Sequence, residues 1–412
     1  MKGPIRYSFL FIPLLLVFLG VCPAQAGILV QCPTDTNGDG ISDDQTVECI
    51  HLSSGDGFTK MADGKDQYIF SFAEIPPGLP IEDIVSDFTG RAMSPAPTIQ
   101  VKQGQELYLS LTNVGMIMRP DLFDSHSVHW HGFPNAGSVF DGVPEVSPAA
   151  AMMATQPYYY KATKEGTYFY HCHVEASEHM QMGMIGNLWV TPLQNELPGG
   201  TDLNGGFTHQ AGNEYLYNDG DGSTFYDKAY PIQLTTFDAA FHDASLYVQP
   251  LPFADMEDNY FMVNGRGYPD SINPGDIVNN ASAYYGTDYA AQNMNARIVA
   301  DVNDKIALRL SNVSTTDLIA LTTTLGVPMR VVARGAELLR GPDPDGDAGP
   351  LQGKDTSYEV NVLNIGGGQA YDVIIDTAGV AAGTYFLYTS NLQFLSNDAE
   401  ERGGIMTEIV IN

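Results

Sequence analysis

Positive charge is scarce in this chain of 412 residues, where 19 Lys and Arg side chains face 49 Asp and Glu side chains, for a formal net charge of −30. The electrostatic field of this negative charge repels phosphate backbones and anionic lipid headgroups, which excludes nucleic acid as a partner. Long apolar runs are lacking after residue 26, so no membrane span is expected. Hydrophobic residues make up 44%, enough for packed cores, and 42 Gly with 25 Pro favour many short strands over long helices.

The N-terminus has the pattern of a signal peptide. Lys2 and Arg6 accompany an apolar run over residues 9–20, and Ala24-Gln25-Ala26 is a cleavage site of the small-x-small type. A lipoprotein interpretation at Cys22 is weaker, because a bulky valine precedes that cysteine. We expect cleavage after residue 26 and export to the periplasm or the cell exterior.

Cysteine is rare, and each position carries a different expectation. Of the four, Cys22 leaves with the signal peptide, while Cys32 and Cys49 flank an acidic loop and could pair in an oxidising compartment. Cys172 remains alone between two histidines. An exported thiol in that setting is predicted to be a metal ligand.

The acidic loop places oxygen-bearing side chains at alternate positions and a glycine at the sixth, which is typical of a Ca²⁺ loop. The expected ligands are Asp35, Asn37, Asp39, Ile41 and Asp43. The twelfth position is Thr46 rather than glutamate, so the loop is not a full EF-hand loop. A solvated acidic turn is the alternative.

Patterning divides the chain into five segments. They are a signal peptide at 1–26, an N-terminal segment with the acidic loop at 27–65, a strand-rich domain at 66–193, a Gly-, Asn- and Asp-rich linker at 194–224, and a second strand-rich domain at 225–412. Aromatic and β-branched runs separated by Gly or Pro predict an all-β fold for both domains.

The two strand-rich domains look like copies of one unit. Residues 104–114 match residues 303–313, the glycine turn at 132–134 matches that at 326–328, and residues 166–169 match residues 383–386. Where the first copy has His171-Cys172-His173, the second has Tyr388-Thr389-Ser390. Where the first has His129 and His131, the alignment gives Thr323 and Leu325. One copy therefore carries soft metal ligands and the other carries none.

The metal ligands fall into two sets because alternate residues of a strand point to opposite faces. On the face of Cys172, two imidazoles, a thiolate and a weak axial thioether are the ligands of blue, type 1 copper. That set consists of His126, Cys172, His179 and Met184. The other face gathers the imidazoles of His129, His131, His171 and His173, which suit copper or zinc. A zinc site would not explain the presence of Met184 as a thioether ligand.

This pattern resembles the copper-bearing end domain of the multicopper oxidase family, and within it the secreted OmpB-like bacterial multicopper proteins. The resemblance covers residues 66–412 and implies two cupredoxin-like Greek-key β-sandwich domains, the second copper-free. It implies type 1 copper at His126, Cys172, His179 and Met184. It further implies type 2 copper at His129 and the type 3 pair at His131, His171 and His173. Asp141 resembles an acid that relays protons near the cluster, with a turn residue as the alternative.

Two features depart from the family pattern. Six residues rather than four separate Cys172 from His179. A trinuclear cluster in this family takes eight imidazoles, and this chain offers four at the right spacing, since His51, His209 and His242 form no His-x-His pair. Two copies of the first domain would supply eight, so we expect a homo-oligomer with the cluster completed between chains.

The sequence thus predicts a copper-dependent oxidoreductase that takes single electrons from a metal ion or a phenol and reduces O2. The alternatives are an electron-transfer or copper-sequestering blue copper protein and a copper nitrite reductase. Met152, Met153, Met180 and Met182 lie near the ligand loops, where thioethers could gather Cu(I), although core packing is the commoner use of methionine.

Overall fold

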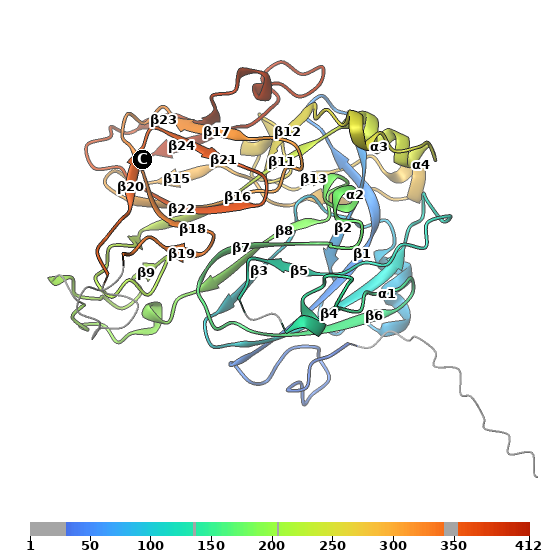
Figure 1. Ribbon diagram of the computed structural model, residues 1–412, viewed down its shortest axis with the longest axis horizontal. Helices are drawn as coiled ribbons and strands as arrows, with labels where there is room; N and C mark the ends of the chain where they lie inside the picture. The colour runs from blue at the N-terminus through green and yellow to red at the C-terminus, as the bar shows by residue number, and fades with distance from the viewer. Residues whose placement is uncertain (1–29, 135–136, 204–205, 342–352) are drawn as a thin grey trace, which may run out of the picture.

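A computed structural model describes residues 30–134, 137–203, 206–341 and 353–412. The predicted signal peptide at 1–26 and Cys22 lie outside the described residues. The described chain folds into two β-sandwiches stacked side by side, the first in the lower part of Figure 1 and the second above it. This confirms the predicted all-β class with cupredoxin-like sandwich domains.

The first sandwich consists of two four-stranded sheets. One has the order β2 (Asp66–Glu74), β1 (Val47–Lys60), β4 (Glu106–Gly115) and β6 (Thr155–Lys161). The other has the order β3 (Ala96–Lys102), β8 (Ile185–Thr191), β7 (Gly166–His171) and β5 (His129–His131). Helix α1 (Ile81–Phe88) lies after β2, and α2 (Ala176–Gln181) lies between β7 and β8.

The second sandwich repeats this plan with added strands. Its larger sheet contains β12 (Tyr260–Val263), β11 (Lys228–Phe237), β16 (Lys305–Asn312), β22 (Gln369–Asp376), β18 (Met329–Arg334) and β19 (Glu337–Leu338), with β20 (Tyr358–Val360) paired to β18. Its smaller sheet contains β15 (Ile298–Ala300), β24 (Met406–Ile411), β23 (Gly383–Thr389), β17 (Ile319–Thr323) and β21 (Val362–Ile365).

Four short strands and two helices complete the described chain. The strands form two ribbons, β9 (Glu214–Tyr215) with β10 (Phe225–Tyr226) and β13 (Ile277–Val278) with β14 (Ala290–Gln292). Helix α3 (Ala239–Leu246) follows β11, and α4 (Ser282–Tyr285) lies between β13 and β14. None of the described helices combines the length and the apolar character that crossing a bilayer requires.

Strand pairing supports the internal repeat. In the first domain β1 runs parallel to β4, and in the second β11 runs parallel to its counterpart β16. Likewise β7 pairs with β5 and β8, as β23 pairs with β17 and β24. Each domain has its own apolar core, one including Leu109 and Trp130 and the other including Leu308 and Ile409.

The expected start of the first domain at residue 66 is wrong. Strand β1 begins at Val47, pairs with both β2 and β4, and lies inside the first sheet. The segment was not recognised because Ser53, Ser54, Gly55 and Gly57 give it little intrinsic strand propensity. Burial between two neighbouring strands overrides that weakness, since most of β1 is excluded from solvent.

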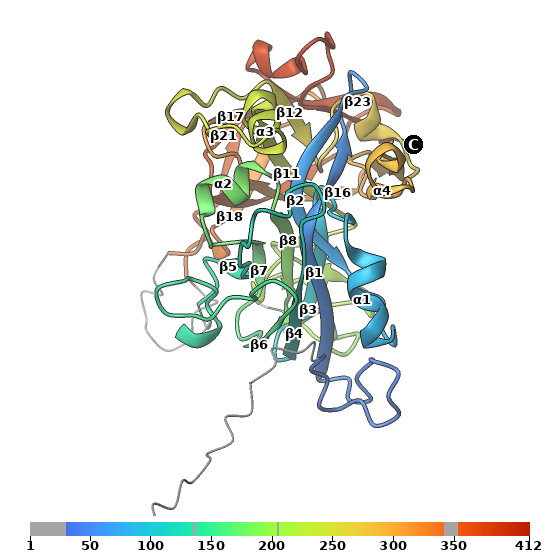
Figure 2. The same cartoon turned by 90° about the vertical axis from the view of Figure 1, so that its right-hand side faces the viewer.

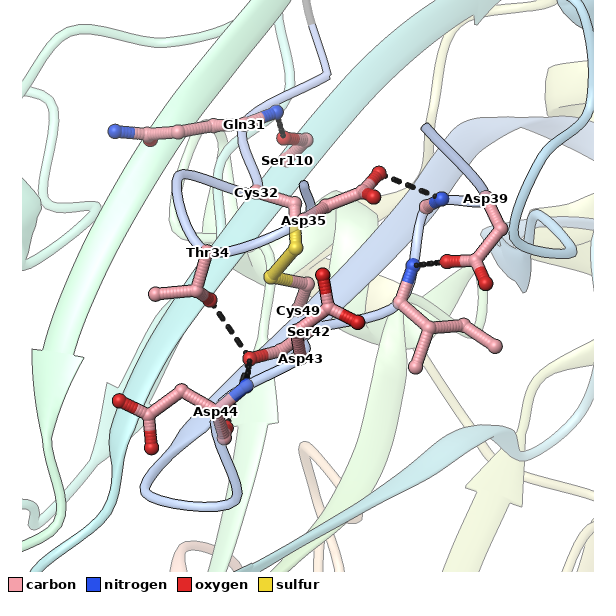
Figure 3. Close-up of a disulfide and its surroundings, with 12 residues drawn as sticks. Gln31, Cys32, Thr34, Asp35, Asp39, Ser42, Asp43, Asp44, Cys49 and Ser110 are labelled. Carbon is pink, nitrogen blue, oxygen red and sulfur yellow. Dashed lines mark hydrogen bonds between the residues drawn. A yellow bond between two sulfur atoms is a disulfide. The ribbon is translucent and has the colours of Figure 1, made fainter. Parts of the chain in front are cut away.

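The N-terminal loop is closed by a disulfide between Cys32 and Cys49, so the pairing left open by the sequence is formed (Figure 3). Asp35 accepts hydrogen bonds from the backbone N–H groups of Gly38 and Gly40 at 2.6 and 2.8 Å, and Asp43 accepts one from Thr36 at 2.8 Å. These bonds lower the pKa of Asp35, and the hydrogen bond from the Thr36 hydroxyl, together with that from the Thr36 N–H group, lowers the pKa of Asp43. The loop is ordered by its own carboxylates, and calcium binding stays a prediction.

A buried polar cluster joins the two domains. Asp372 of β22 accepts a hydrogen bond from Tyr217 of the predicted linker at 2.6 Å and another from Thr167 of β7. Arg309 of β16 donates to the Thr167 hydroxyl at 3.1 Å. The side chains of Arg309 and Asp372 are only 2% and 1% exposed, so the cluster is shielded from water. The segment between the domains is therefore packed into their junction through Tyr217.

We expect Asp372→Ala to destabilise the protein by about 3–5 kcal/mol, because it leaves a buried guanidinium without its carboxylate. Chemical denaturation monitored by intrinsic fluorescence measures this free energy of unfolding. Asp376→Ala, the same change at an exposed position of the same strand, is the control and should cost less than about 0.5 kcal/mol. If Asp372→Ala and Asp376→Ala lost the same free energy of unfolding, the stabilising role of the buried contact between Asp372 and Arg309 would be contradicted.

His51 predicts a pH dependence of stability. It is buried in β1 with its Nε2 atom 2.7 Å from the Thr112 hydroxyl, and burial lowers its pKa from 6.5 to about 4. The unfolded chain therefore takes up a proton below pH 6.5 that the folded chain refuses until about pH 4. Stability should fall across this window by up to about 3 kcal/mol from this group alone. In copper-free protein, His51→Gln should flatten the slope between these pH values, measured by denaturation at each pH.

Candidate metal centre

Two neighbouring strands position the predicted ligands. In the register of β5 and β7, His129 lies opposite His171 and His131 opposite Phe169. His126 precedes β5 and forms a bridge with Ala150, while the Asn113 amide donates to the carbonyls of Asp124 and Ala150 at 2.8 and 3.0 Å. The loop that carries His126 is thereby fixed against the first sheet.

Three buried donor atoms converge on the Cys172 side. The Cys172 sulfur lies 3.2 Å from Nδ1 of His179 and 4.0 Å from Nδ1 of His126, and all three residues are fully buried. The ligand atoms lie within 4.8 Å of one another. In both rings it is Nδ1 that faces the sulfur, and the Nε2 atoms have no hydrogen-bond partner among the described residues. Two imidazole nitrogens and one sulfur are the donor set of type 1 copper.

The sulfur and the fourth expected ligand are held by the backbone. The Ser127 N–H group points at the Cys172 sulfur at 3.4 Å and fixes its position. The Cys172 N–H group donates to the Met184 carbonyl at 3.1 Å, and Met184 is fully buried. The structure therefore brings His126, Cys172, His179 and Met184 into one neighbourhood.

The two imidazoles of this set are electrostatically different. Burial lowers the pKa of His126 well below its usual value, and the nearby His179 adds to the effect. Burial also disfavours a charge on His179, but Cys172 and Asp124 outweigh it and raise the pKa of His179 to about 10. Asp124 lies 3.8 Å from Nε2 of His179. Binding of a metal to Nδ1 of His179 would therefore displace a proton from this ring.

The opposite face of the same strands gathers four imidazoles. His129 is central, with ring centroids 5.2 Å from His171 and 5.0 Å from His173, and Nδ1 of His131 lies 3.4 Å from Nε2 of His171. Burial lowers the pKa of His131 to about 4 and that of His171 to about 3. Both rings are therefore neutral near pH 7, the form that binds metal.

Asp141 lies beside this face. Nδ1 of His129 donates to the Asp141 carbonyl at 2.7 Å, and the Asp141 carboxylate is 3.4 Å from the same nitrogen. This hydrogen bond leaves Nε2 of His129 free for a metal. Gly142, with φ of +76°, allows the close approach, since a Cβ there would lie 2.2 Å from the Val128 carbonyl. The position fits both the proton-relay and the turn interpretations, and the relay stays a prediction.

The second domain offers no imidazole at the corresponding positions. Strand register pairs Thr322 with Tyr388, and the Thr324 N–H donates to the Phe386 carbonyl, so Thr322 and Thr324 occupy the places of His129 and His131. The sequence alignment, which gave Thr323 and Leu325, is wrong by one residue because β17 pairs one step earlier than the glycine match implies. The conclusion that this copy lacks soft ligands is unchanged.

The four expected methionines lie in different environments, and Met152 is half-buried beside Gly115. Met182 is fully buried in the first core, whereas Met153 is 44% exposed near Gly115. Met180 lines an open groove of about 480 Å³ that it shares with Ser177 of α2 and Asp317 of the second domain. Core packing therefore accounts for Met182 and in part for Met180, which packs against Phe169, Ile185 and Val313, but not for the exposed Met153.

Several residues around the metal ligands were not found from the sequence. Asp124 faces His179, and Ser127 supports Cys172. Both lie within two residues of His126, and their proximity was the one available signal. Gln181 contacts the second domain, and its partners are more than fifty residues away in the chain, so no local pattern reveals them.

Residues 89–195 match the family model described as multicopper oxidase. The chain is 30% identical over 107 residues to the protein named multicopper oxidase MCE of Talaromyces pinophilus, covering 24% of this chain and 16% of that protein. It is 31% identical over 118 residues to L-ascorbate oxidase of Cucumis sativus, covering 27% of this chain and 18% of that one. The chain thus matches less than a fifth of the length of either relative.

The fold likeness extends over both domains. The crystal structure of a blue copper oxidase from Nitrosomonas europaea superposes with a TM-score of 0.57 at 20% identity, covering 88% of this chain and 85% of that chain. The matched family region contains all eight expected copper ligands, and copper is the cofactor that this family implies.

Proposed function

We propose that this chain is a multicopper oxidase and couples one-electron oxidation of a metal ion or a phenol to reduction of O2, on the strength of the family match over residues 89–195. The observation that carries the proposal is the arrangement of two ligand sets on opposite sides of β7. The buried His126, Cys172 and His179 set lies on one side, and His129, His131 and His171 lie on the other with the ring of His173 beside them. A carrier of single electrons needs only the first set.

The chain supplies a short covalent path between the two sets. Cys172 is bonded to His171 and His173, so its sulfur is joined to their imidazoles through side-chain and backbone atoms alone. A further link is the hydrogen bond from Nδ1 of His171 to the Cys172 carbonyl at 2.8 Å. Copper, when bound, supplies the one-electron chemistry and the affinity for O2. His129, fixed by the Asp141 carbonyl, keeps Nε2 available, and the nearby carboxylate of Asp141 is the group we assign to proton relay.

We further propose that the four-imidazole face is completed by a second copy of the first domain, in a homo-oligomer. The face is accessible from outside, since His129 keeps 16% of its side-chain surface exposed. In the second domain of this chain, Thr322 and Thr324 occupy the strand positions equivalent to His129 and His131, so this domain supplies no imidazole there. The mature protein is expected to act after export, in the periplasm or outside the cell, and the resemblance to the OmpB-like subgroup stays a prediction.

Metal counting with absorption and EPR spectra of the copper-loaded protein tests the function. An oxidase should show a type 1 signal together with a type 2 signal and a coupled, EPR-silent pair. The missing imidazoles of the second domain favour a second candidate, a blue copper carrier or copper-binding protein, which would show type 1 copper alone. Types 1 and 2 without a coupled pair would indicate a nitrite reductase. Either outcome would contradict the oxidase proposal.

A further inference from the structure

The second domain forms hydrogen bonds with the loop that carries His179 and Met184, two of the expected type 1 ligands. This loop runs from Cys172 through α2 to Met184, and Gln181 ends the helix between His179 and Met184. Figures 1 and 2 show α2 at the junction of the domains, near α3. Gln181 belongs to the first domain and is 1% exposed. Its buried polar atoms must therefore find partners within the protein.

All of those partners belong to the second domain. The Gln181 side-chain amide donates to Asp258 at 2.9 Å, and its side-chain oxygen accepts from the Thr315 hydroxyl at 2.9 Å. Its backbone carbonyl accepts from Nε2 of His242 at 2.8 Å. The three partners come from separate segments, namely the approach to β12, the loop after β16, and helix α3. A single residue is thus fixed from three directions.

Two of these partners, Asp258 and His242, are themselves held in place, whereas Thr315 is exposed. Asp258 accepts hydrogen bonds from the hydroxyls of Thr236 and Thr316, each at 2.5 Å, so its carboxylate is held in one orientation. His242 is fully buried, and its other ring nitrogen lies 2.5 Å from the Tyr68 carbonyl in β2. The imidazole therefore bridges the copper loop and the first sheet. These contacts tie the segment between His179 and Met184 to both domains.

Close packing of Gly183 against the second domain also restricts the loop. Gly183 has φ of +108°, and a Cβ added there would lie 3.3 Å from the Phe237 ring of the second domain. The loop returns to the first domain at once, because the Gly183 carbonyl accepts from the Ser71 hydroxyl at 2.9 Å and Phe70 donates to the Met182 carbonyl at 2.9 Å. The segment between His179 and Met184 is thus held between the two domains.

We propose that Gln181 is a positioning residue through which the second domain sets the geometry of the type 1 copper site. Gln181 does not touch the ligand atoms. It acts by fixing the backbone between His179 and Met184, which determines where their donor atoms stand relative to the Cys172 sulfur. This inference rests on the proposed type 1 copper site. It assigns the second domain, which has no expected copper ligands, the role of positioning ligands in the first.

The test uses the full chain loaded with copper(II). Gln181→Ala removes both side-chain bonds, and Thr315→Val removes one of them at nearly constant volume. We expect both variants to bind copper(II) more weakly, by about tenfold or more for Gln181→Ala, since such supporting contacts are worth about 10–100-fold in metal affinity. Competition with a chelator measures the affinity. The ratio of the thiolate-to-copper absorption bands and the EPR hyperfine splitting should shift in the same samples.

Two control variants separate positioning from general damage. Thr315→Ser keeps the hydroxyl and should restore wild-type affinity and spectra. Thr322→Val removes a threonine hydroxyl of the same domain, one that donates to the Asn361 carbonyl, and should change neither. If Gln181→Ala does not fold, the Thr315 pair decides the question. Folded Gln181→Ala or Thr315→Val with wild-type affinity and spectra would overturn the proposal.

A metal-independent measurement distinguishes this inference from the proposed function. In copper-free protein, Gln181→Ala should speed amide hydrogen exchange over residues 172–184 relative to wild type. If the wild-type chain shows no thiolate-to-copper absorption, the type 1 copper site and the proposed function fail, whatever the exchange rates. If the wild type is blue and the exchange of this segment is unchanged in the variant, the positioning role alone fails.

Discussion

Cys172→Ser will abolish the visible colour of the copper-loaded protein and its oxidation of substrate. The Cys172 sulfur is fully buried, lies 3.2 Å from Nδ1 of His179, and receives the Ser127 N–H group. A serine hydroxyl keeps nearly the same size but is not ionised near pH 7 and is a harder ligand, which suits copper less. Since even supporting contacts cost about 10–100-fold, we expect the loss of a ligand to reduce turnover by more than about 100-fold.

The same variant contains its own control. The four imidazoles on the other face of β7 do not depend on the sulfur, so copper at that face should persist in Cys172→Ser and be counted by metal analysis. Stopped-flow reduction of the copper-loaded samples would show whether electrons still enter. A blue Cys172→Ser protein, or one that oxidises substrate at the wild-type rate, would exclude Cys172 as the ligand and contradict the path from its sulfur to His171 and His173.

Dilution should abolish O2 reduction while leaving the type 1 colour intact. Each chain contributes four imidazoles at the accessible face, and Thr322 and Thr324 supply none from the second domain. If a second chain completes the cluster, the active fraction follows the fraction of associated chains. Well below the dissociation constant of the oligomer, the rate per chain should fall about in proportion to protein concentration.

An oxygen electrode and analytical ultracentrifugation, applied to one concentration series, measure both quantities. Absorption of the type 1 site per chain serves as the internal control, because its ligands all come from one chain and are fully buried. His131→Ala is the matched variant and should remain blue but lose O2 reduction at every concentration. A monomer with undiminished O2 reduction would contradict the shared cluster.

Much of the fold could be predicted from the sequence, since aromatic and β-branched runs such as residues 158–161 and 306–310 become β6 and β16. Strand β1 could not, because its serines and glycines have weak strand propensity and its stability comes from pairing with β2 and β4. The alignment of the second domain, which placed Thr323 and Leu325 at the positions of His129 and His131, was wrong for a related reason. A matched glycine fixes a turn, whereas the partner of Thr322 is set by pairing across the sheet.

The ligand sets could be predicted because they depend on spacing within two short runs and on the two-residue period of strands. The contacts around Gln181 could not, because Asp258, Thr315 and His242 become its neighbours only when the two domains pack together. Local sequence reports which side chains share a face. It does not report which distant segment covers that face.

The direct opposition of His129 and His171 makes the colour of this protein a reporter of correct folding. If β5 and β7 slipped by one residue, the histidines would exchange sides with Trp130 and Tyr170, and the ligand sets would scatter. A misaligned chain could still be compact and rich in strands, but it would not acquire a thiolate-to-copper band. During refolding with copper present, the appearance of blue should therefore mark the moment at which these two strands lock into register, separately from the gain of secondary structure.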